Sequence, residues 1–459
     1  MLKENIWKKY DVVEVSKVFE MGEDYKEFLS LSKTEREANK EIIRRAEDKG
    51  FHNIVDYIDG NKSLKPGDKI YADNRGKAVA LFIIGKDSIT NGMNILGAHI
   101  DSPRLDLKAN PLYEDTDFAY FDTHYYGGIK KYQWTTIPLA LHGVIVKKDG
   151  TKIDVNIGEG DDDPVFCITD LLPHLASEQM KKDASKLIEG EALDVLIGNM
   201  PLKGEDKESV KINVLSILKD KYDISEDDFL SSEIEVVPAG KARDMGFDRS
   251  MVLSYGQDDR SCAYSSLMAF LKADVTDKTL CCILVDKEEI GSVGSTGMES
   301  RFFENTVAEI CYLLGEDSFV SVRRVLSNSR MLSSDVNAAY DPLYASVMDK
   351  RNSSYLARGL VFCKYTGSRG KSGSNDADAE FVAELRNILD SDNVSYQISE
   401  LGKVDAGGGG TIAYILANYD VKVIDAGVGV LNMHAPYEVT SKVDIYEAYR
   451  GYLAFLMKA

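Results

Sequence analysis

Residues 280–294 read LCCILVDKEEIGSVG, an apolar run that stops at two adjacent glutamates and a glycine-rich turn. A continuous apolar run of this length predicts a buried strand in a sheet that is covered on both faces. Open α/β sheets keep their active sites where such strands end. One carboxylate there can hold a metal ion while its neighbour moves a proton, so Glu288 and Glu289 are candidate site residues of a metal hydrolase. Adjacent acids are usually just solvated, and the hypothesis therefore depends on the rest of the chain.

Earlier segments predict more of the same sheet. Residues 78–84 and 94–99 are largely apolar runs and indicate two further buried strands. A helix is predicted over 34–49, because Thr34 and Glu37 match a capping box before an apolar stripe of helical period. The first part of the chain is therefore expected to contribute both helix and sheet.

Strand and helix patterns alternate from residue 236 onward. The predicted strands cover 280–285, 361–364, 394–399 and 421–425. The predicted helices begin near Ser261, Asn375, Thr411 and Ser441, the last with a second capping box formed with Asp444. This alternation predicts a three-layer α/β/α domain with a mixed sheet.

The block 104–235 has a different character. Residues 139–146 and 151–157 flank an Asp-Gly dipeptide, which is a hairpin signal, and a polar, acidic stretch follows them. We therefore expect an inserted, β-rich domain at 104–235 and a catalytic domain built from 1–103 and 236–459.

Composition excludes several classes of protein. The chain has 459 residues and a net charge of −20, which disfavours binding to nucleic acid. No apolar run approaches the roughly 18 residues of a membrane span, and the first residues lack the apolar region of a signal peptide. The six cysteines form no CxxC pair and read as small buried hydrophobes. A cytosolic protein without nucleic-acid or membrane partners is expected.

Two histidines follow predicted strands. His99 lies two residues before Asp101, whose carboxylate can accept the second ring N–H of a metal-bound imidazole and fix its tautomer. His434 follows the predicted strand 421–425. The alternative for His99 is a histidine that caps a turn, and the alternative for His434 is a partly buried surface histidine.

Three aspartates complete the candidate set. Asp258 and Asp259 precede a predicted helix, where carboxylates are most often N-caps. Asp335 can equally be a turn residue. Taken singly, each of these residues has an ordinary structural explanation.

Taken together, the ordered motifs resemble the M18 family of metalloaminopeptidases, which includes aspartyl aminopeptidase and vacuolar aminopeptidase I. The resemblance covers essentially the whole chain. It is carried by His99/Asp101, Gln257-Asp258-Asp259-Arg260, Asp286-Lys287-Glu288-Glu289-Ile290-Gly291-Ser292, Ser334-Asp335 and Met433-His434. Asp259-Arg260 departs from the Asp-Asn-Leu often found there.

The resemblance implies two divalent metal ions bridged by Asp258 and a hydroxide, with Glu288 as general base and Asp101 behind His99. The ions would be zinc, with cobalt and manganese as alternatives, because the donors are nitrogen and oxygen only. Three ligand carboxylates and one hydroxide neutralise two dications, so the cluster can be buried. The implied ligand sets are His99, Asp258 and Asp335 for one ion, and Asp258, Glu289 and His434 for the other.

Weaker signals concern substrate and assembly. By resemblance, His174 in the inserted block reaches the active site of a neighbouring subunit. The alternative is that His174 makes local contacts only. Lys371 resembles a position near the substrate's first side chain, with Arg369 and Arg104 as rival cations. The glycines at 407–410 predict a flexible turn beside the substrate rather than a phosphate-binding loop.

The resulting prediction is an aminopeptidase that acts on peptides with a free N-terminus and assembles into a homo-oligomer, by resemblance a tetrahedral dodecamer. Two rivals stay open. One is a binuclear amidase or deacylase on the same scaffold, and the other is a non-catalytic scaffold protein that keeps the fold.

Overall fold

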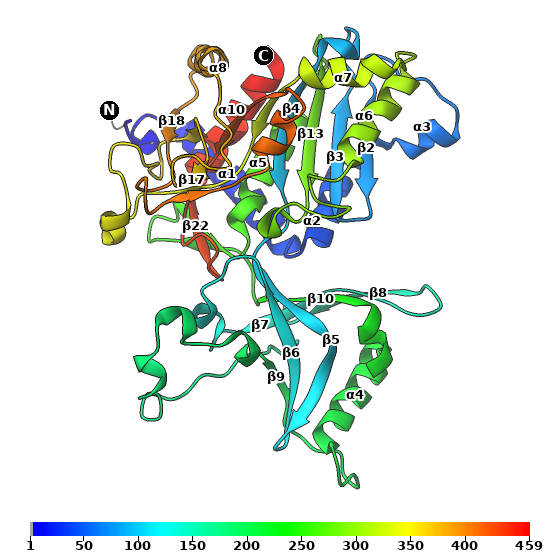
Figure 1. The fold of residues 1–459 in the computed structure, drawn as a ribbon, viewed down its shortest axis with the longest axis vertical. Coiled ribbons are helices and arrows are strands. Elements are labelled where there is room, and N and C mark those ends of the chain that lie inside the picture. Colours follow the sequence, from blue (N-terminus) through cyan, green and yellow to red (C-terminus); the bar gives the residue numbers. More distant parts are fainter. Residues whose placement is uncertain (1–2) are drawn as a thin grey trace. The chain divides into compact units, whose positions relative to one another are not determined.

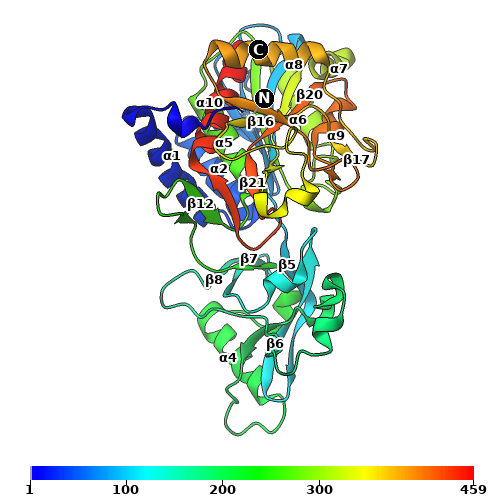
Figure 2. The ribbon, with the colours of Figure 1, turned by 90° about the vertical axis from the view of Figure 1, so that its left-hand side faces the viewer.

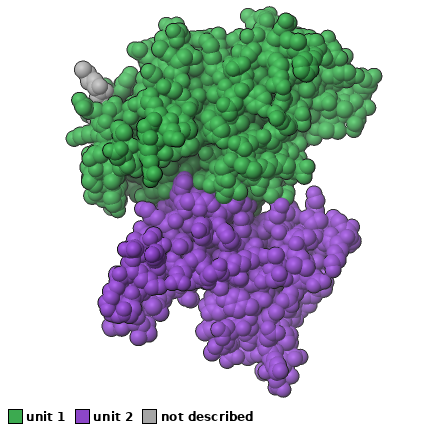
Figure 3. Space-filling view, in the orientation of Figure 1, with its two compact units in different colours: residues 1–101, 242–433, 438–459 green, residues 102–241, 434–437 purple. Residues whose placement is uncertain are grey.

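The computed structural model describes residues 3–459, which form two compact units (Figure 3). The large unit comprises residues 1–101, 242–433 and 438–459, and the small unit comprises 102–241 and 434–437. The chain therefore passes between the units four times. The last two crossings bound the segment 434–437, which contributes only four residues to the small unit.

A nine-stranded mixed sheet is the framework of the large unit (Figure 1). Its four central strands, β13, β4, β14 and β20, are mutually parallel, whereas β3 and β16 run antiparallel to their central neighbours. In spatial order the strands are β1 (His52–Asn53), β2 (Lys69–Asn74), β3 (Ala78–Ile83), β13 (Thr279–Val285), β4 (Met93–His99), β14 (Arg330–Ser333), β20 (Lys422–Gly427), β16 (Leu360–Cys363) and β18 (Tyr396–Ser399). The predicted strands are confirmed.

Helices cover both faces of this sheet and bury two separate apolar cores. One face carries α1 (Val12–Leu31), α2 (Glu35–Glu47), α5 (Gln257–Lys272), α8 (Ala379–Ser391) and α10 (Lys442–Lys458). The other carries α3 (Val55–Asp59), α6 (Phe302–Leu313), α7 (Phe319–Ser327) and α9 (Ala413–Ala417). The predicted three-layer α/β/α arrangement is therefore correct.

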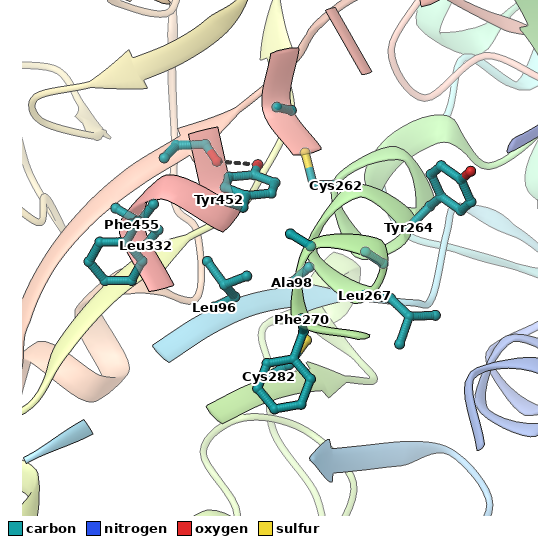
Figure 4. Close-up of a cluster of buried hydrophobic side chains, with 14 of the residues drawn as sticks. Leu96, Ala98, Cys262, Tyr264, Leu267, Phe270, Cys282, Leu332, Tyr452 and Phe455 are labelled. Carbon is teal, nitrogen blue, oxygen red and sulfur yellow. Dashed lines mark hydrogen bonds between the residues drawn. The ribbon is translucent and has the colours of Figure 1, made fainter. Parts of the chain in front are cut away.

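The core beneath α5 and α10 rests on β4 (Figure 4). Leu96 and Ala98 of β4 and Leu267 of α5 belong to this core, and all three are fully buried. The hydroxyl of Tyr452 in α10 donates a hydrogen bond to the carbonyl of Ala426 at 2.6 Å, which satisfies the only polar atom of that side chain. Burial of each large apolar side chain stabilises the fold by about 1.5–3 kcal/mol, and this core fixes α5 over the end of β4.

Two successive capping boxes begin the chain's first helices. The predicted box of Thr34 and Glu37 is confirmed at the start of α2. The helix α1 precedes it and was missed, although Asp11 and Glu14 form the same motif. Its buried positions follow a helical period from Val18 to Leu29, but the exposed Val12 and Val13 at its start blur the apolar pattern.

The capping box predicted at the start of α10 is wrong. The Ser441 side chain makes no capping hydrogen bond. The carboxylate of Asp444 instead accepts the backbone N–H groups of Ala357 at 2.6 Å and Gly359 at 2.7 Å. Buried amides need acceptors, and this tertiary demand overrides the local motif.

The other predicted helix starts are close to the observed ones. The helix α5 begins four residues before Ser261, α8 begins four residues after Asn375, and α9 begins two residues after Thr411. Helix boundaries set by tertiary contacts are difficult to read from local pattern.

Smaller sheets complete the large unit. A five-stranded sheet contains β11 (Arg243–Met245), β12 (Met251–Ser254), β22 (Glu438–Ser441), β21 (Gly429–Leu431) and β15 (Asn337–Ala338). A short ribbon pairs β17 (Gly367–Ser368) with β19 (Gly408–Gly409), so part of the glycine-rich segment is paired.

The small unit is built on a six-stranded antiparallel sheet. Its strands, in order, are β8 (Lys152–Ile157), β7 (Leu139–Val146), β10 (Ser232–Pro238), β5 (Arg104–Asp115), β6 (Phe118–Tyr126) and β9 (Val195–Gly198). The helix α4 (Ser209–Tyr222) packs on this sheet. The predicted hairpin is confirmed as β7 and β8.

None of the helices formed by residues 3–459 combines the length and apolarity needed to cross a membrane. All six cysteines are free thiols, and four of them are buried, as the apolar contexts predicted.

Candidate metal centre

Strand register brings three candidate side chains to one edge of the large sheet. In the parallel pairs, Val285 of β13 lies opposite His99 of β4, and Ser333 of β14 lies opposite Gly97. Asp335, two residues beyond Ser333, is therefore level with His99. Glu288 follows β13 by three residues, in a short 3-10 helix at the same edge. The carboxyl ends of neighbouring parallel strands thus supply an imidazole and two carboxylates.

The imidazole of His99 is the centre of this group. Its Nε2 lies 3.3 Å from Asp258 Oδ1, 3.9 Å from Glu288 Oε2 and 4.0 Å from Asp335 Oδ1. The side chain of His99 is only 1% exposed, so water cannot screen these charges. A ring nitrogen surrounded by carboxylate oxygens needs either a proton or a cation between them.

Asp101 contacts the other side of the ring and the short 3-10 helix that carries the glutamates. Its Oδ1 lies 3.2 Å from His99 Nδ1, and its two oxygens accept the backbone N–H groups of Glu288 and Glu289, each at 3.2 Å. The Asp101 side chain is fully buried. One carboxylate therefore orients the imidazole and fixes the backbone beneath both glutamates.

The electrostatics of the cluster favour a bound cation. Burial raises the pKa of Asp335 well above its usual range, and the charges of Asp259 and Glu288 raise it further. Burial acts against protonated His99, but hydrogen bonds to Asp101 and Asp258 outweigh it and raise the pKa of His99. A divalent ion would compensate these crowded negative charges, so the donor set fits a metal such as zinc.

Two sets of side chains in the large unit place ligand atoms within 4.8 Å of one another. His99 groups with Asp258 and Asp335 in one set, and with Glu288 and Glu289 in the other. An oxygen of Asp258 is also within 4.8 Å of an oxygen of Glu289. The large unit alone therefore gathers four of the five predicted ligands.

The start of α5 positions Asp258 through backbone contacts. Asp258 and Asp259 have non-helical backbone angles at the beginning of α5, and the peptide bond that joins them is cis. The Asp259 carboxylate makes no capping hydrogen bond to a backbone N–H of this helix among residues 3–459. Its Oδ2 instead accepts the backbone N–H of His99 at 3.4 Å. The second aspartate thus supports the strand that carries the imidazole.

Glu438 and Gln257 also position Asp258. Glu438 was missed, and Gln257 was named only as part of a motif, without this role. Glu438 is buried and its Oε2 accepts the backbone N–H of Asp258 at 3.0 Å. The Gln257 amide donates to the Glu438 carbonyl at 2.6 Å and accepts from the Tyr25 hydroxyl at 3.0 Å. No local sequence motif marks Glu438, because its burial is visible only in the structure.

Arg260, where the sequence departs from the family pattern, is also buried. Its Nε donates to the carbonyl of Ile100 at 3.1 Å, directly after His99. This bond ties α5 to the segment between His99 and Asp101, so the replacement serves the architecture of the cluster.

His434 belongs to the small unit. Its Nδ1 lies 2.8 Å from the carbonyl oxygen of Gly128, which leaves Nε2 as the nitrogen suited to a metal. The segment that carries it links β21 to β22, which pair with each other in the large unit. Its role as a ligand stays a prediction.

The weaker candidates are placed as follows. His174 is exposed in a turn of the small unit, five residues before a short 3-10 helix at Gln179–Lys181. Lys371 Nζ lies 3.7 Å from the centre of the Tyr365 ring and 3.3 Å from an Asp376 oxygen. Arg104 is buried and paired with Asp106 and Glu235 in the small unit, so its charge is already balanced there.

Comparisons with known proteins show which proteins the chain is similar to. The model of the aminopeptidase I zinc metalloprotease family (M18) matches residues 28–456. A probable M18 family aminopeptidase 1 of Clostridium acetobutylicum is 62% identical over 459 residues, which cover 99% of each chain. Its counterpart in Thermotoga maritima is 47% identical over 462 residues, covering 100% of this chain and 99% of that protein.

Solved structures show the same likeness. The M18 aminopeptidase of Thermotoga maritima has a TM-score of 0.96 at 46% identity, with both chains fully covered. Aminopeptidase I of Clostridium acetobutylicum has a TM-score of 0.93 at 60% identity, covering 99% of this chain and all of that one. An S. cerevisiae mApe1 dodecamer shares the fold, with a TM-score of 0.77 at 18% identity over 95% of this chain and 96% of its own.

Proposed function

The chain belongs to the M18 family of zinc metallopeptidases, and from this premise we propose a two-ion mechanism in which Glu288 is the general base. As a family aminopeptidase it is a hydrolase that acts on peptides. The observation that carries the mechanism is the position of His99 Nε2, 3.3–4.0 Å from the carboxylates of Asp258, Glu288 and Asp335.

The first ion would be held by His99, Asp258 and Asp335, whose ligand atoms already lie within 4.8 Å of one another. The second would be held by Asp258, Glu289 and His434. The proximity of Asp258 and Glu289 oxygens supports a shared Asp258. The short 432–437 connection supports the His434 assignment, because Glu438 at its end contacts the Asp258 backbone.

When bound, a pair of divalent ions lowers the pKa of water and polarises the scissile carbonyl. Glu288 would remove the proton from the attacking water and deliver it to the leaving amine. Its position suits this task, since Asp101 fixes its backbone while its side chain, 16% exposed, keeps access to the substrate. Asp101 keeps the His99 ring in one orientation throughout.

Release of the N-terminal residue requires recognition of the free α-amine. That amine has a pKa of about 7.7–8.0, so its neutral form is readily available at neutral pH. We assign it to the cation site next to Glu289, since a carboxylate and a Lewis acid together suit an amine. A blocked N-terminus lacks this group and is expected to be a poor substrate.

Assembly is proposed to complete the site. His174 lies in the small unit among the exposed apolar side chains of Leu171, Leu172, Leu175 and Met180. Exposed apolar surface of this kind suits a contact with another subunit. We assign His174 to the neighbouring subunit's active site within a closed homo-oligomer, a dodecamer by family resemblance.

A matched pair of substrates tests the reaction. Initial rates are measured on a dipeptide with a free N-terminus and on its N-acetyl form, after zinc, cobalt or manganese has been added back to apoprotein. Cleavage of the free form alone, dependent on metal, is the expected result. Equal cleavage of both forms would favour an amidase or deacylase. If neither form is cleaved with any of the three metals, a scaffold protein is favoured.

A further inference from the structure

One row of residues across the large sheet is small and polar, although its neighbour on the same face is apolar. Strand register places in this row, from β4 to β18, Gly97, Ser333, Asp425, Cys363 and Ser399. The row two residues earlier on β4, β14 and β20 belongs to the apolar core beneath α6, α7 and α9, and consists of Ile95, Met331 and Val423. His99 stands two residues after Gly97 on β4, so the polar row lies one step below the proposed ligands.

Asp425 is the one acid in this row, and it is only 4% exposed. Burial raises the pKa of Asp425 to about 7, while the side chains of Thr411 and Ser333 act in the opposite direction as hydrogen-bond donors to the carboxylate. These contacts are loose, since neither Asp425 oxygen nor the Ser333 hydroxyl makes a hydrogen bond of ordinary geometry among residues 3–459. A buried polar group needs a partner, so this carboxyl depends on the two hydroxyl groups beside it.

Thr411 joins the glycine-rich turn 407–410 to α9. Its Oγ1 accepts the backbone N–H of Ala413 at 3.3 Å, at the start of α9. The helix α9 packs against β20, the strand that carries Asp425 (Figure 2). A hydroxyl that accepts one hydrogen bond still has its own proton to donate, so Thr411 can cap α9 and contact the Asp425 carboxylate at the same time.

The glycine-rich turn has few contacts of its own. Gly408 and Gly409 pair with β17, and Gly410 is exposed, with space for a Cβ that would meet nothing within 4 Å. Glycine has more backbone freedom than any other residue, so four in succession do not fix their own conformation. The position of the turn is therefore set by the ribbon on one side and by Thr411 on the other.

The segment that follows the turn lies beside the proposed metal centre. An ideal Cβ on Gly97, two residues before His99, would lie 3.7 Å from Ile412 Cδ1. Burial is the main cause of the high pKa of Asp425, and the charge of Glu288 adds to it, so the two carboxyl groups lie within electrostatic reach of each other. The turn 407–410 is thus close both to the strand that carries the imidazole and to the proposed general base.

We propose that Asp425 is a positioning residue for substrate binding, whose carboxyl holds Thr411 and thereby keeps the exposed backbone of 407–410 where the substrate's peptide backbone binds. This inference rests on the proposed aminopeptidase function. Asp425 is buried and belongs to none of the candidate ligand sets, so it acts through Thr411 rather than on a metal ion or the peptide. Its loss should therefore weaken substrate binding while the metal centre stays intact.

Four variants of the zinc-loaded enzyme test this role. Asp425→Asn keeps the shape of the acid and removes its charge, and Thr411→Val keeps the shape of threonine and removes its hydroxyl. Thr411→Ser retains the hydroxyl and should restore the wild-type behaviour. The matched control is Asp420→Asn, an exposed acid in the turn that precedes β20.

Asp425→Asn and Thr411→Val should each raise KM for a dipeptide with a free N-terminus about 10-fold and lower kcat less than about threefold, with unchanged zinc content. The double variant should be no worse than about twofold beyond either single variant, because both changes remove the same contact. Hydrogen exchange of the amides of 408–411 should become at least about threefold faster in both variants. Thr411→Ser and Asp420→Asn should stay within about twofold of the wild type in every measurement.

Four outcomes would overturn the proposal. These are a KM and exchange rate that Asp425→Asn leaves unchanged, an equal effect of Asp420→Asn, effects of the two single variants that multiply in the double variant, and loss of zinc from Asp425→Asn. A wild-type enzyme that does not cleave the dipeptide would instead contradict the proposed function. In that case the exchange rates alone decide whether Asp425 holds the turn.

Discussion

Replacing Asp101 by asparagine should loosen the metal centre without changing any ligand. The carboxylate of Asp101 accepts two backbone N–H groups and faces His99 Nδ1, each contact at 3.2 Å. Asparagine keeps one acceptor oxygen, and its NH₂ group must then face at least one of these donors. A buried donor left without an acceptor costs about 1–3 kcal/mol.

That cost converts into a measurable change in affinity. Removal of a carboxylate that supports a ligating histidine reduces metal affinity about 10–100-fold, which corresponds to roughly 1.4–2.7 kcal/mol. Part of the loss should be recovered at high metal concentration, because all proposed ligands remain. Turnover at saturating metal should still fall, since the backbone of Glu288 is no longer fixed by two bonds.

Competition with a chelator of known affinity measures the metal Kd of the variant and of the wild type. Asp162→Asn, at an exposed position of the small unit, is the matched control. An Asp101→Asn protein with wild-type metal affinity and turnover within about twofold would refute the positioning role. An equal loss in both variants would show a non-specific charge effect.

Three further results are expected. Glu288→Gln should keep both metals and lose about 10²–10⁴-fold in kcat, whereas Glu289→Ala should lose metal. Elemental analysis together with rate measurements distinguishes the two outcomes. The reverse pattern would show that the two roles are exchanged. His174→Ala should reduce turnover while metal content stays constant, and unchanged turnover rules out its proposed role. Burial raises the pKa of Asp444 from 3.8 to about 7, so the folded state binds this proton more tightly. This proton adds up to about 4 kcal/mol to the free energy of unfolding below about pH 4, and the contribution is lost as pH rises through 7. Urea unfolding should show this decline in the wild type and not in Asp444→Asn. An identical pH profile in both proteins would contradict the prediction.

Strand positions could be predicted because their apolar runs are self-contained. The run at 280–285 shows that a buried strand ends just before Glu288, and 94–99 shows the same for His99. What local pattern does not contain is the pairing that makes β13, β4 and β14 parallel neighbours. That pairing, which sets Asp335 level with His99, depends on contacts far apart in the chain.

Glu438 was missed and Asp259 was expected to be an N-cap, and both of them act on backbone groups. Glu438 accepts the N–H of Asp258, and Asp259 accepts that of His99. Backbone donors are the same at every position, so no side-chain motif marks the partner. Asp444 shows the converse. Residues 441–444 match a capping box in sequence, but the Asp444 carboxylate instead accepts the backbone N–H groups of Ala357 and Gly359.

The four-residue segment 434–437 changes what protein engineers can do with the insertion. An inserted domain that touched its host only through its two ends could be cut out and the ends rejoined at residues 101 and 242. Here the carbonyl oxygen of Gly128, in the inserted block, lies 2.8 Å from Nδ1 of His434, a residue more than three hundred positions downstream. Excision would remove this hydrogen-bond partner, so a shortened chain would lose the contact that orients a proposed zinc ligand.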